Sequence, residues 1–491
     1  MNKTKTIDLP EPRTIAWYDN QILYIVFLVF VSGILLLPGM RGNPVNSWDE
    51  ARHAVNALEM VQSGNWITVT YNHEPDFANI KFPLGAWLIA INYKLFGINE
   101  FSLRLWSVVF TISTTVLVYL FGSLIKNRWL GVLAGLIFIT SMQVIVKHAG
   151  ITGDYDAGAS FFVTLSLFLF LLFYKTEKRG FLFSSMAAIG LGIMYKSFVP
   201  GLIPLFIIST FLLFSKKRKI FFNLKMLSLC VLIIIGIISP WLILRSASDS
   251  SFFIILLNSD YWQRLTTPVD NHGEPFWFYL GQMGTGFFPW IYLLPFGLFA
   301  VFRGYKKNKN EYDLFLLIWF FTIFLLFSLA TTKNFWYMLP IFPAMALIVA
   351  IFWQRILELV RKMEVGEGLF LVTVIFLIFG IVAAFLNVRH YLAAYRNKDD
   401  FLAFISQEPV KKELVSADMT VVHISQSSQS HLFYLKRLLG DKFVFSQAVS
   451  CELDNTRRFM VKATDGFLSK YLETCPERKI VGRYGENALI R

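Results

Sequence analysis

The segment Asn46-Ser47-Trp48-Asp49-Glu50-Ala51-Arg52-His53 directly follows the first strongly apolar run of the chain, at residues 21–39. It therefore lies where a chain leaving a lipid bilayer would meet water. Two adjacent carboxylates, an arginine and a histidine fall within one or two helical turns. Isolated charges beside a membrane are usually solvated surface. A functional interpretation of this segment depends on whether later loops bring further charge to the same side.

The composition indicates a polytopic membrane protein. The 491 residues are 55% hydrophobic and 16% charged, with a mean hydropathy of +0.53. A soluble domain carries roughly 25% charged residues. The net charge of +13 resides mostly in short Lys/Arg clusters between apolar runs. That placement is typical of membrane topology and gives no support for nucleic-acid binding.

The apolar runs predict about eleven transmembrane helices. A shorter run at 83–97 carries Trp87, Tyr93 and Lys94, which suit a helix lying in the membrane interface without crossing it. The first run is long and lacks a small-residue cleavage site after it, so we expect a retained span. The spans are expected near residues 21–39, 104–125, 129–146, 157–174, 180–195, 199–214, 220–243, 288–302, 313–331, 334–353 and 366–388.

The basic clusters decide the orientation, because lysine and arginine favour the cytoplasmic side. With residues 1–20 inside and 83–97 not crossing, these clusters all fall inside and the C-terminus lies outside. The predicted transmembrane domain covers 21–395, with outer loops at 40–103 and 245–287. Charge near a membrane is costly and tends to mark function. The outer ionisable residues include Asp49, Glu50, Arg52, Lys81, Asp154, Asp156, Lys196, His272, Glu274 and Lys333.

The polar region 396–491 predicts a small α/β domain outside the membrane, large enough for a modest core. Strands are expected at 421–424, 442–446, 457–462 and 478–483, and helices at 429–439 and 465–473. Neither a nucleotide-binding loop nor a metal-spaced Cys/His set is found in its sequence. Cys451 and Cys475 could pair in an oxidising compartment, whereas Cys230 lies in an apolar run and is expected to be inert.

Seven short motifs lie on or beside the predicted outer segments. They are Trp48-Asp49-Glu50-Ala51-Arg52; Lys81-Phe82-Pro83-Leu84 with Trp87; Phe96-Gly97 with Leu103-Arg104-Leu105; Asp156 ahead of Phe161-Phe162; Gly190-Leu191-Gly192-Ile193-Met194-Tyr195-Lys196-Ser197; His272 with Pro275, Tyr279 and Pro289-Trp290; and Lys333 with Tyr337-Met338-Leu339-Pro340. In this order they resemble the polyprenyl-phosphate-sugar glycosyltransferases of the C-type superfamily. That family includes lipid A aminoarabinose transferases and protein O-mannosyltransferases.

The resemblance covers about residues 20–350 and implies an inverting transfer from a polyprenyl-phosphate sugar to a lipid-linked glycan or lipid A at the periplasmic face of a bacterial inner membrane. A protein O-mannosyltransferase-like enzyme and a non-catalytic lipid or solute transporter are alternatives. A third is a C-terminal binding domain on a passive anchor. Departures from the family pattern are Ile80, Phe82 and Ser197. An acidic residue often stands where Ile80 does and looks like a metal ligand in some relatives, so whether a divalent metal is bound is left open.

The resemblance also implies roles for single residues. Cations placed where phosphate charge develops would stabilise the transition state. Asp49 is the first choice for a general base. Asp156 would bind sugar hydroxyls or order nearby cations, with a helix N-cap as its alternative; Asp154 is expected to be a plain cap. The predicted phosphate ligands are Arg52, Lys81, Lys196 and Lys333, and the supporting residues are Glu50, Tyr337, Glu274 and His272, the last a candidate metal ligand.

Overall fold

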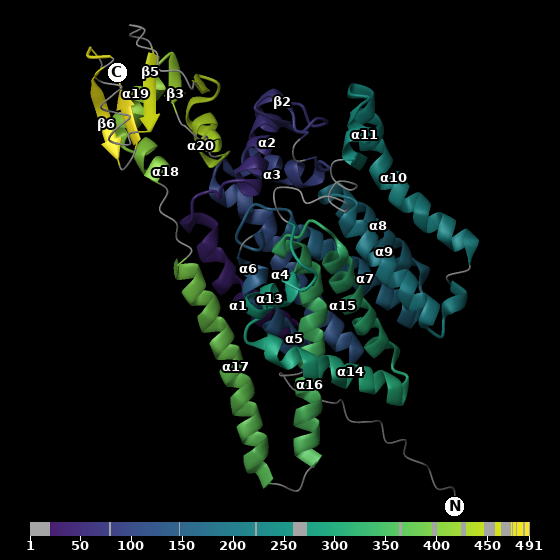
Figure 1. Cartoon of the computed structure of the whole chain (residues 1–491). Helices are drawn as coiled ribbons and strands as arrows, with labels where there is room; N and C mark the ends of the chain where they lie inside the picture. The colour runs from purple at the N-terminus through teal and green to yellow at the C-terminus, as the bar shows by residue number, and fades with distance from the viewer. Residues whose placement is uncertain are drawn as a thin grey trace, which may run out of the picture.

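The computed structural model describes residues 20–490 with gaps at 78–79, 147, 221–222, 259–272, 363–365, 395–399, 424–428, 446–456, 463–472, 474, 478 and 485–486. The chain forms a helical bundle, and a small α/β domain stands beside one end of it (Figure 1). This confirms the predicted fold class.

Seven described helices are long and apolar enough to cross a membrane, or eight if one bent pair counts as a single span. Many apolar side chains on α17 are exposed, including Leu371, Ile375 and Phe379. Such a surface suits lipid contact, and the chain is an integral membrane protein. The seven are formed by α1 (Gln21–Gly42), α4 (Glu100–Ile125), α7 (Asp156–Thr176), α10 (Leu224–Ser248), α15 (Glu311–Leu329), α16 (Phe342–Lys362) with the short helix η5 (Phe335–Ile341) that leads into it, and α17 (Gly366–Ala394).

The other expected spans correspond to shorter or broken helices. The predicted helix at 129–146 is divided at Thr140 and Ser141, whose hydroxyls donate to the carbonyls of Leu136 and Ile137. The segment expected at 288–302 belongs to a pair bent by 119°. These elements are α5 (Arg128–Ile139), α6 (Met142–Ile145), α8 (Arg179–Tyr195), α9 (Val199–Phe214), α13 (Phe278–Gly286), η4 (Trp290–Leu293) and α14 (Leu294–Asn308).

The predicted outer loop forms a compact cap on one end of the bundle. Its helix α3 has 13 residues, about 20 Å, which is less than the hydrocarbon thickness. The non-crossing helix expected at 83–97 is therefore too short for a span. The cap comprises α2 (Asp49–Ser63), β1 (Thr70–Tyr71), β2 (Glu74–Pro75) and α3 (Leu84–Phe96). The remaining short elements are η2 (Arg218–Ile220) and α11 (Phe252–Leu257).

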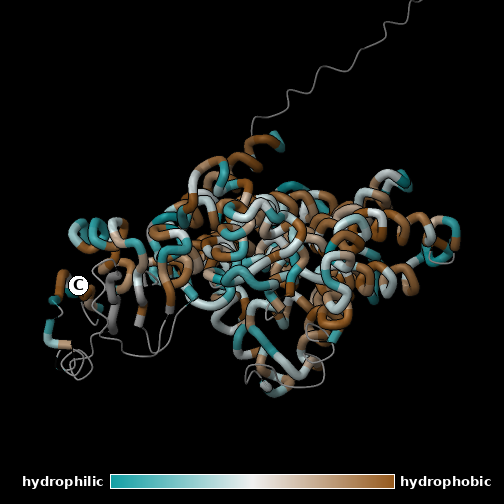
Figure 2. Tube along the Cα trace, turned by 90° about the horizontal axis from the view of Figure 1, so that it is seen from above, coloured by the Kyte–Doolittle hydropathy of each residue, from teal (hydrophilic) through white to brown (hydrophobic). Residues whose placement is uncertain are grey.

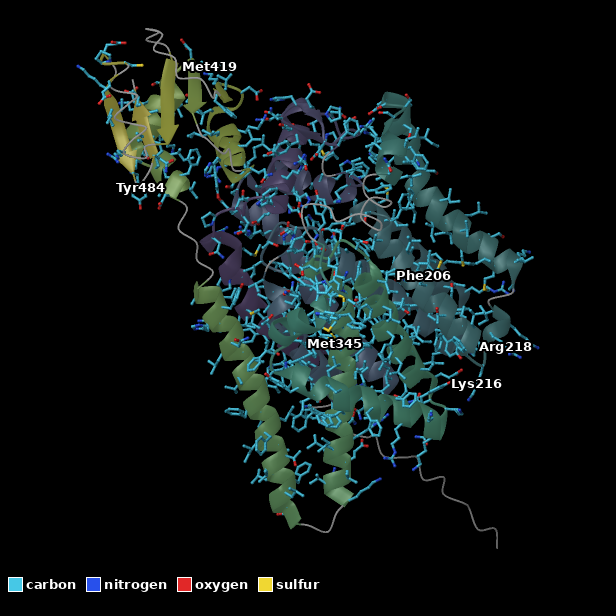
Figure 3. All side chains as sticks on the ribbon, viewed as in Figure 1. Phe206, Lys216, Arg218, Met345, Met419 and Tyr484 are labelled. Carbon is cyan, nitrogen blue, oxygen red and sulfur yellow. The ribbon has the colours of Figure 1, made fainter. Side chains whose placement is uncertain are left out.

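The two ends of the bundle differ in charge as the topology argument requires. The end of α16, with Arg361 and Lys362, and the end of α14, with Lys306 and Lys307, lie away from α2, α3 and the α/β domain (Figure 1). The loop carrying Lys216 and Arg218 also lies well away from Met419 and Tyr484 of that domain (Figure 3). Seen from above, long apolar stretches run along the helices of the bundle, with shorter polar stretches between them (Figure 2).

The C-terminal domain is built on a five-stranded sheet in the order β4-β3-β5-β7-β6. Strand β3 pairs in parallel with β4 and β5, whereas β7 is antiparallel to β5 and β6. Two helices and the last strand were not expected from the sequence. The elements are α18 (Asp400–Ile405), α19 (Glu408–Ser416), β3 (Met419–His423), α20 (Gln429–Leu439), β4 (Phe443–Phe445), β5 (Arg457–Lys462), β6 (Ile480–Tyr484) and β7 (Asn487–Ile490).

Two sequence predictions fall largely on residues that the structure does not describe. The helix expected at 465–473 lies outside the described residues except for Glu473. Cys475 is buried and disulfide-bonded, and Cys230 is a buried free thiol. Because Cys451 lies outside the described residues, its pairing with Cys475 stays a prediction.

Candidate active site at the capped end of the bundle

Helix α2 begins with the two carboxylates that open the sequence argument. Its N-cap is Trp48, whose φ of 73° and ψ of −125° are rare for a residue with a β-carbon. Such a backbone costs on the order of 1–3 kcal/mol and persists where surrounding contacts hold it. Asp49 is the first helical residue, and 42% of its side chain is exposed. The cap conformation therefore sets the direction in which Asp49 points.

The side chain of Glu50 holds the first turn of α2 in place. Its Oε1 accepts from Arg104 Nε at 2.6 Å and from the Gly153 amide at 2.8 Å. Its Oε2 accepts from the Asn46 amide at 2.8 Å. Burial alone would raise the pKa of Glu50, but the charge and hydrogen bonds of Arg104 lower it below its ordinary value. Glu50 thus supports the site by joining α2, α4 and the 148–155 loop.

A histidine that the sequence analysis did not single out lies at the centre of the site. His148 Nδ1 is 3.8 Å from Asp49 Oδ2, 3.4 Å from Asp154 Oδ1 and 4.0 Å from Asp156 Oδ2. Its ring stacks on Trp336 with centroids 3.7 Å apart. The sequence signal was its place in the outer turn at 147–156, a few residues before two aspartates.

Asp156 and Lys196 form an ion pair between the first residue of α7 and the C-cap of α8. Lys196 Nζ also lies 5.9 Å from the centroid of the Tyr337 ring. The Phe82 amide donates to the Lys196 carbonyl at 3.3 Å, which ties the segment beside Lys81 to the same place. Three predicted site residues are therefore brought together by chain segments far apart in sequence.

Asp154 is not a helix cap, contrary to the sequence-based expectation. The N-cap of α7 is Tyr155, and the Asp154 side chain is buried. His53 lies on its other side, with Nδ1 3.9 Å from Asp154 Oδ1, and stacks on Tyr155 at 3.8 Å. Asp156 is the first helical residue, so the alternative of an N-cap does not hold for it either.

The site shifts the pKa values of two carboxyl groups, those of Asp49 and Asp154, in opposite directions. Burial alone would raise the pKa of Asp49, but the neighbouring imidazoles of His53 and His148 and the charges of Lys81 and Lys196 lower it. Asp49 is therefore ionised at neutral pH. Burial raises the pKa of Asp154 to about 7, with further contributions from Glu50 and Asp49.

The pKa values of His53 and Lys196 are shifted as well. Burial lowers the pKa of His53 to about 4, so its imidazole is neutral. Burial would also lower the pKa of Lys196, but Asp156 reverses that effect and raises it. Lys196 therefore stays cationic, as a phosphate ligand must.

Three of these groups could hold a divalent cation. One ligand atom each from Asp49, His148 and Asp154 lies within 4.8 Å of the others. Among the described residues, His148 Nδ1 and Asp154 Oδ1 are buried without a hydrogen-bond partner. Buried polar atoms without partners are costly, and carboxylate and imidazole are common metal ligands. The donor set fits a divalent metal, which would polarise an oxygen bound beside Asp49.

Arg52 is engaged elsewhere in this structure. Its Nε and Nη2 donate to the two oxygens of the fully buried Asp76 carboxylate, at 2.8 and 2.5 Å. Its guanidinium lies 4.4 Å from the centroid of the Tyr71 ring, and Asn56 also donates to Asp76. A phosphate role for Arg52, which stays a prediction, would require this pair to open or to be shared.

Lys333 also has other partners in the described residues. Its ammonium donates to the backbone carbonyls of Glu274 and Ala330, at 2.8 and 2.5 Å. Burial lowers its pKa. The Glu274 side chain is exposed, and His272 lies outside the described residues. The described contacts of Lys333 and Glu274 therefore do not join them to the Asp49 cluster, and the predicted metal role of His272 stays a prediction.

Comparison with known proteins agrees with the sequence motifs. The family described as dolichyl-phosphate-mannose-protein mannosyltransferase matches residues 75–244. An undecaprenyl phosphate-alpha-4-amino-4-deoxy-L-arabinose arabinosyl transferase from Pectobacterium carotovorum is 31% identical over 343 residues, which are 68% of this chain and 60% of the relative. This chain therefore spans about three fifths of the length of that relative.

Two solved structures share the fold. ArnT from Cupriavidus metallidurans, bound to undecaprenyl phosphate, has a TM-score of 0.73 at 17% identity. The aligned region covers 96% of this chain and 98% of the ArnT chain. The Archaeoglobus fulgidus oligosaccharyltransferase has a TM-score of 0.61 at 13% identity, covering 87% and 65%. These structures show the fold, and the matching family model and the Pectobacterium relative, together with the ordered motifs, assign the chain to the polyprenyl-phosphate-sugar glycosyltransferases of the C-type superfamily.

Proposed function

We propose that this chain is an inverting glycosyltransferase that moves a sugar from a polyprenyl-phosphate donor to a lipid-linked glycan or lipid A at the periplasmic face of the inner membrane. The observation that carries the proposal is the convergence of Asp49, His148, Asp156 and Lys196 at one end of the bundle. The name of the Pectobacterium relative supports aminoarabinose as the first sugar to test.

The cations of the site suit the leaving group. Breaking the anomeric C–O bond of the donor leaves a polyprenyl phosphate with additional negative charge. Lys196, held by Asp156 and Tyr337, would stabilise that charge as it develops. Lys81 acts on the same region, because its charge lowers the pKa of Asp49. Lys196 by its contacts and Lys81 by its charge near Asp49 are therefore the phosphate ligands in this proposal.

The role of Asp49 depends on the acceptor. A hydroxyl acceptor must lose a proton, and an ionised, partly exposed carboxylate can accept it. A lipid A phosphate is already ionised and would need only to be oriented. A divalent cation on Asp49, His148 and Asp154 would then neutralise the carboxylates that otherwise repel such an acceptor.

Reconstitution in proteoliposomes tests the proposal, with undecaprenyl-phosphate 4-amino-4-deoxy-L-arabinose as donor and lipid A as acceptor. We expect Asp49→Asn and Lys81→Ala to abolish transfer while the protein still inserts in the membrane. Asp249→Asn and Lys94→Ala remove the same charges on other outer segments and should leave transfer intact. Wild-type transfer by Asp49→Asn would exclude the assignment.

Protein O-mannosylation is the second candidate, favoured by the family match over residues 75–244. Mass spectrometry of glycolipids and secreted proteins from cells with and without the gene separates the two. A one-sugar mass difference on lipid A supports the first candidate, and a hexose on secreted proteins supports the second. A transporter is disfavoured because transporters place charge near the bilayer midplane, whereas this cluster lies at one end.

A further inference from the structure

The C-terminal domain contacts the turn that carries Asp49. Helix α20 lies beside α2 (Figure 1). At the start of α2, Gln429 Oε1 accepts a hydrogen bond from the Trp48 amide at 2.7 Å. Farther along α2, Lys436 Nζ pairs with Glu59 Oε1 at 2.9 Å, with both side chains buried. One helix of the domain therefore holds α2 at two points.

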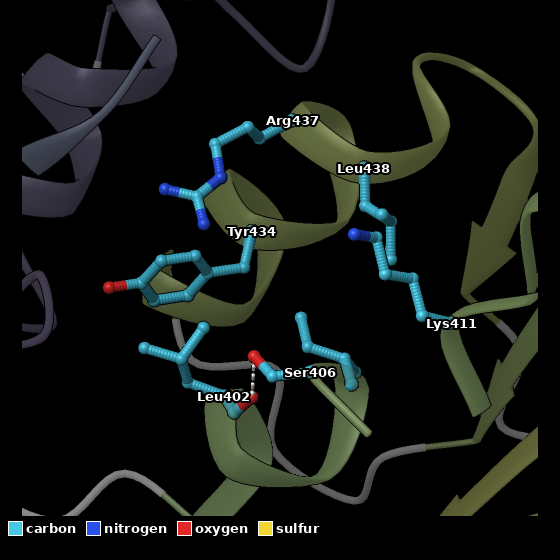
Figure 4. A pocket seen from close by; sticks show the side chains of 7 residues that line it. Leu402, Ser406, Lys411, Tyr434, Arg437 and Leu438 are labelled. Atoms are coloured by element: carbon cyan, nitrogen blue, oxygen red, sulfur yellow. Dashed lines mark hydrogen bonds between the residues drawn. The ribbon is translucent and has the colours of Figure 1, made fainter. Parts of the chain in front are cut away.

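Two further contacts extend this docking surface. The Val45 amide donates to the Tyr434 hydroxyl at 2.8 Å. Arg437 pairs with Glu100, the first residue of α4, at 3.1 Å. In the close view, Tyr434 and Arg437 extend from α20 to the side away from Lys411, beside a cavity of about 240 Å³ against Leu402 (Figure 4). The domain is thus fixed to the segment before α2 and to the start of α4 as well as to α2 itself.

The Gln429 contact falls on the residue whose backbone is strained. Trp48 makes no side-chain capping hydrogen bond to α2, and the residue is 72% exposed. Its carbonyl accepts from the Arg52 amide within α2, whereas its own amide is held from outside by Gln429. A residue with a β-carbon keeps such a conformation where its neighbours fix it. Gln429 supplies that fixation one residue before Asp49.

We propose that the C-terminal domain is a positioning element of the active site, acting through Gln429 on the Trp48 amide to set the direction of Asp49. Gln429 touches no reacting atom in this scheme. Its effect reaches the chemistry through one peptide unit, and an error of about 1 Å at a reacting group can cost two orders of magnitude in rate. The kinetic consequence rests on the proposed function, whereas the structural consequence does not.

The structural consequence is measured by amide hydrogen exchange of the full chain in nanodiscs. Gln429→Met removes the acceptor and keeps the length of the side chain. We expect faster exchange in the peptide covering residues 44–50 and unchanged exchange in α4. Gln429→Glu keeps an acceptor oxygen and should restore protection. Arg437→Met is the matched control, because it removes a docking contact of the same helix at Glu100 and leaves Trp48 untouched.

The kinetic consequence is measured with undecaprenyl-phosphate aminoarabinose as the probe donor. We expect Gln429→Met to lower kcat about tenfold with less than about a twofold change in donor KM, since only the placement of a reacting group changes. Gln429→Glu should recover most of that loss, and Arg437→Met should match the wild type. A loss that merely reflects weaker docking would be equal in Gln429→Met and Arg437→Met.

Each outcome decides the inference. Unchanged exchange at 44–50 in Gln429→Met overturns it, whatever the kinetics. Faster exchange with a wild-type kcat, or equal losses in Gln429→Met and Arg437→Met, also overturns it. If the wild type transfers nothing from the probe donor, the proposed function fails with that substrate. In that case faster exchange confined to Gln429→Met still supports the hold on the Asp49 turn.

Discussion

The carboxylate of Asp156, which begins α7, pairs with the ammonium group of Lys196, the C-cap residue of α8. The two residues are 40 positions apart, and the ring of Tyr337 lies beside the lysine. The pair places a fixed cation at the capped end of the bundle, where these two packed helices meet. It also leaves Asp156 next to His148, so cation and carboxylates face one another across a single site.

Removal of the Lys196 charge should therefore affect the chemical step. We expect Lys196→Met to lower kcat by about 10²–10³-fold, the usual cost of one group that stabilises developing charge. Lys196→Arg should retain part of the activity, because it keeps the charge with a different shape. Turnover with a polyprenyl-phosphate sugar donor is the measurement, with Lys94→Met as control. A wild-type kcat for Lys196→Met would remove the lysine from the mechanism.

The buried Glu50–Arg104 pair should govern stability more than catalysis. Glu50→Gln leaves Arg104 without its carboxylate, and breaking such a buried pair costs about 3–5 kcal/mol. We expect a lower thermal midpoint in detergent at pH 7. Because the folded-state pKa of Glu50 lies below its ordinary value of 4.5, its contribution is present above pH 4.5 and is lost on further acidification. The midpoint of Glu50→Gln should accordingly fall less between pH 5 and pH 3 than that of the wild type.

A divalent cation should bind where Asp49, His148 and Asp154 meet. Electron paramagnetic resonance of added Mn²⁺ measures this binding, and we expect His148→Ala to weaken it at least about tenfold. Affinity should rise as the pH passes through about 7, because Asp154 must lose its proton to bind the metal. His73→Ala removes an exposed histidine of the same cap and serves as control. Equal Mn²⁺ affinity in both variants would exclude this site.

Substitutions of Lys81 and Lys333 should have different effects on the affinity for undecaprenyl phosphate. Loss of one charge-assisted contact costs about 1.5–3 kcal/mol, so Lys81→Met should weaken binding about ten- to a hundredfold. Lys333 donates to the carbonyls of Glu274 and Ala330. We therefore expect Lys333→Met to lower the thermal midpoint without changing the affinity. The reverse result would return Lys333 to the phosphate site.

The sequence predicted most of the helices and the gathering of several charged loops at one end of the bundle. The length of an apolar run and the basic residues beside it are local properties of the sequence. They correctly predicted the helices α1, α4, α7 and α10. The break after Ile139 was missed, because two hydroxyl residues inside an apolar run look the same in a spanning helix and in a broken one. Strand β7 was missed because four residues at the chain end give too short a pattern.

By itself, the sequence determined that this chain is a bundle of apolar helices with its ionisable residues at one end, because hydrophobicity and charge act through each segment separately. Only the tertiary structure decided which charges meet. In the folded chain His148 lies beside Asp49, Arg52 donates to Asp76, and Gln429 accepts from the Trp48 amide. These contacts depend on how loops and helices pack across long sequence separations, and no local periodicity records that packing.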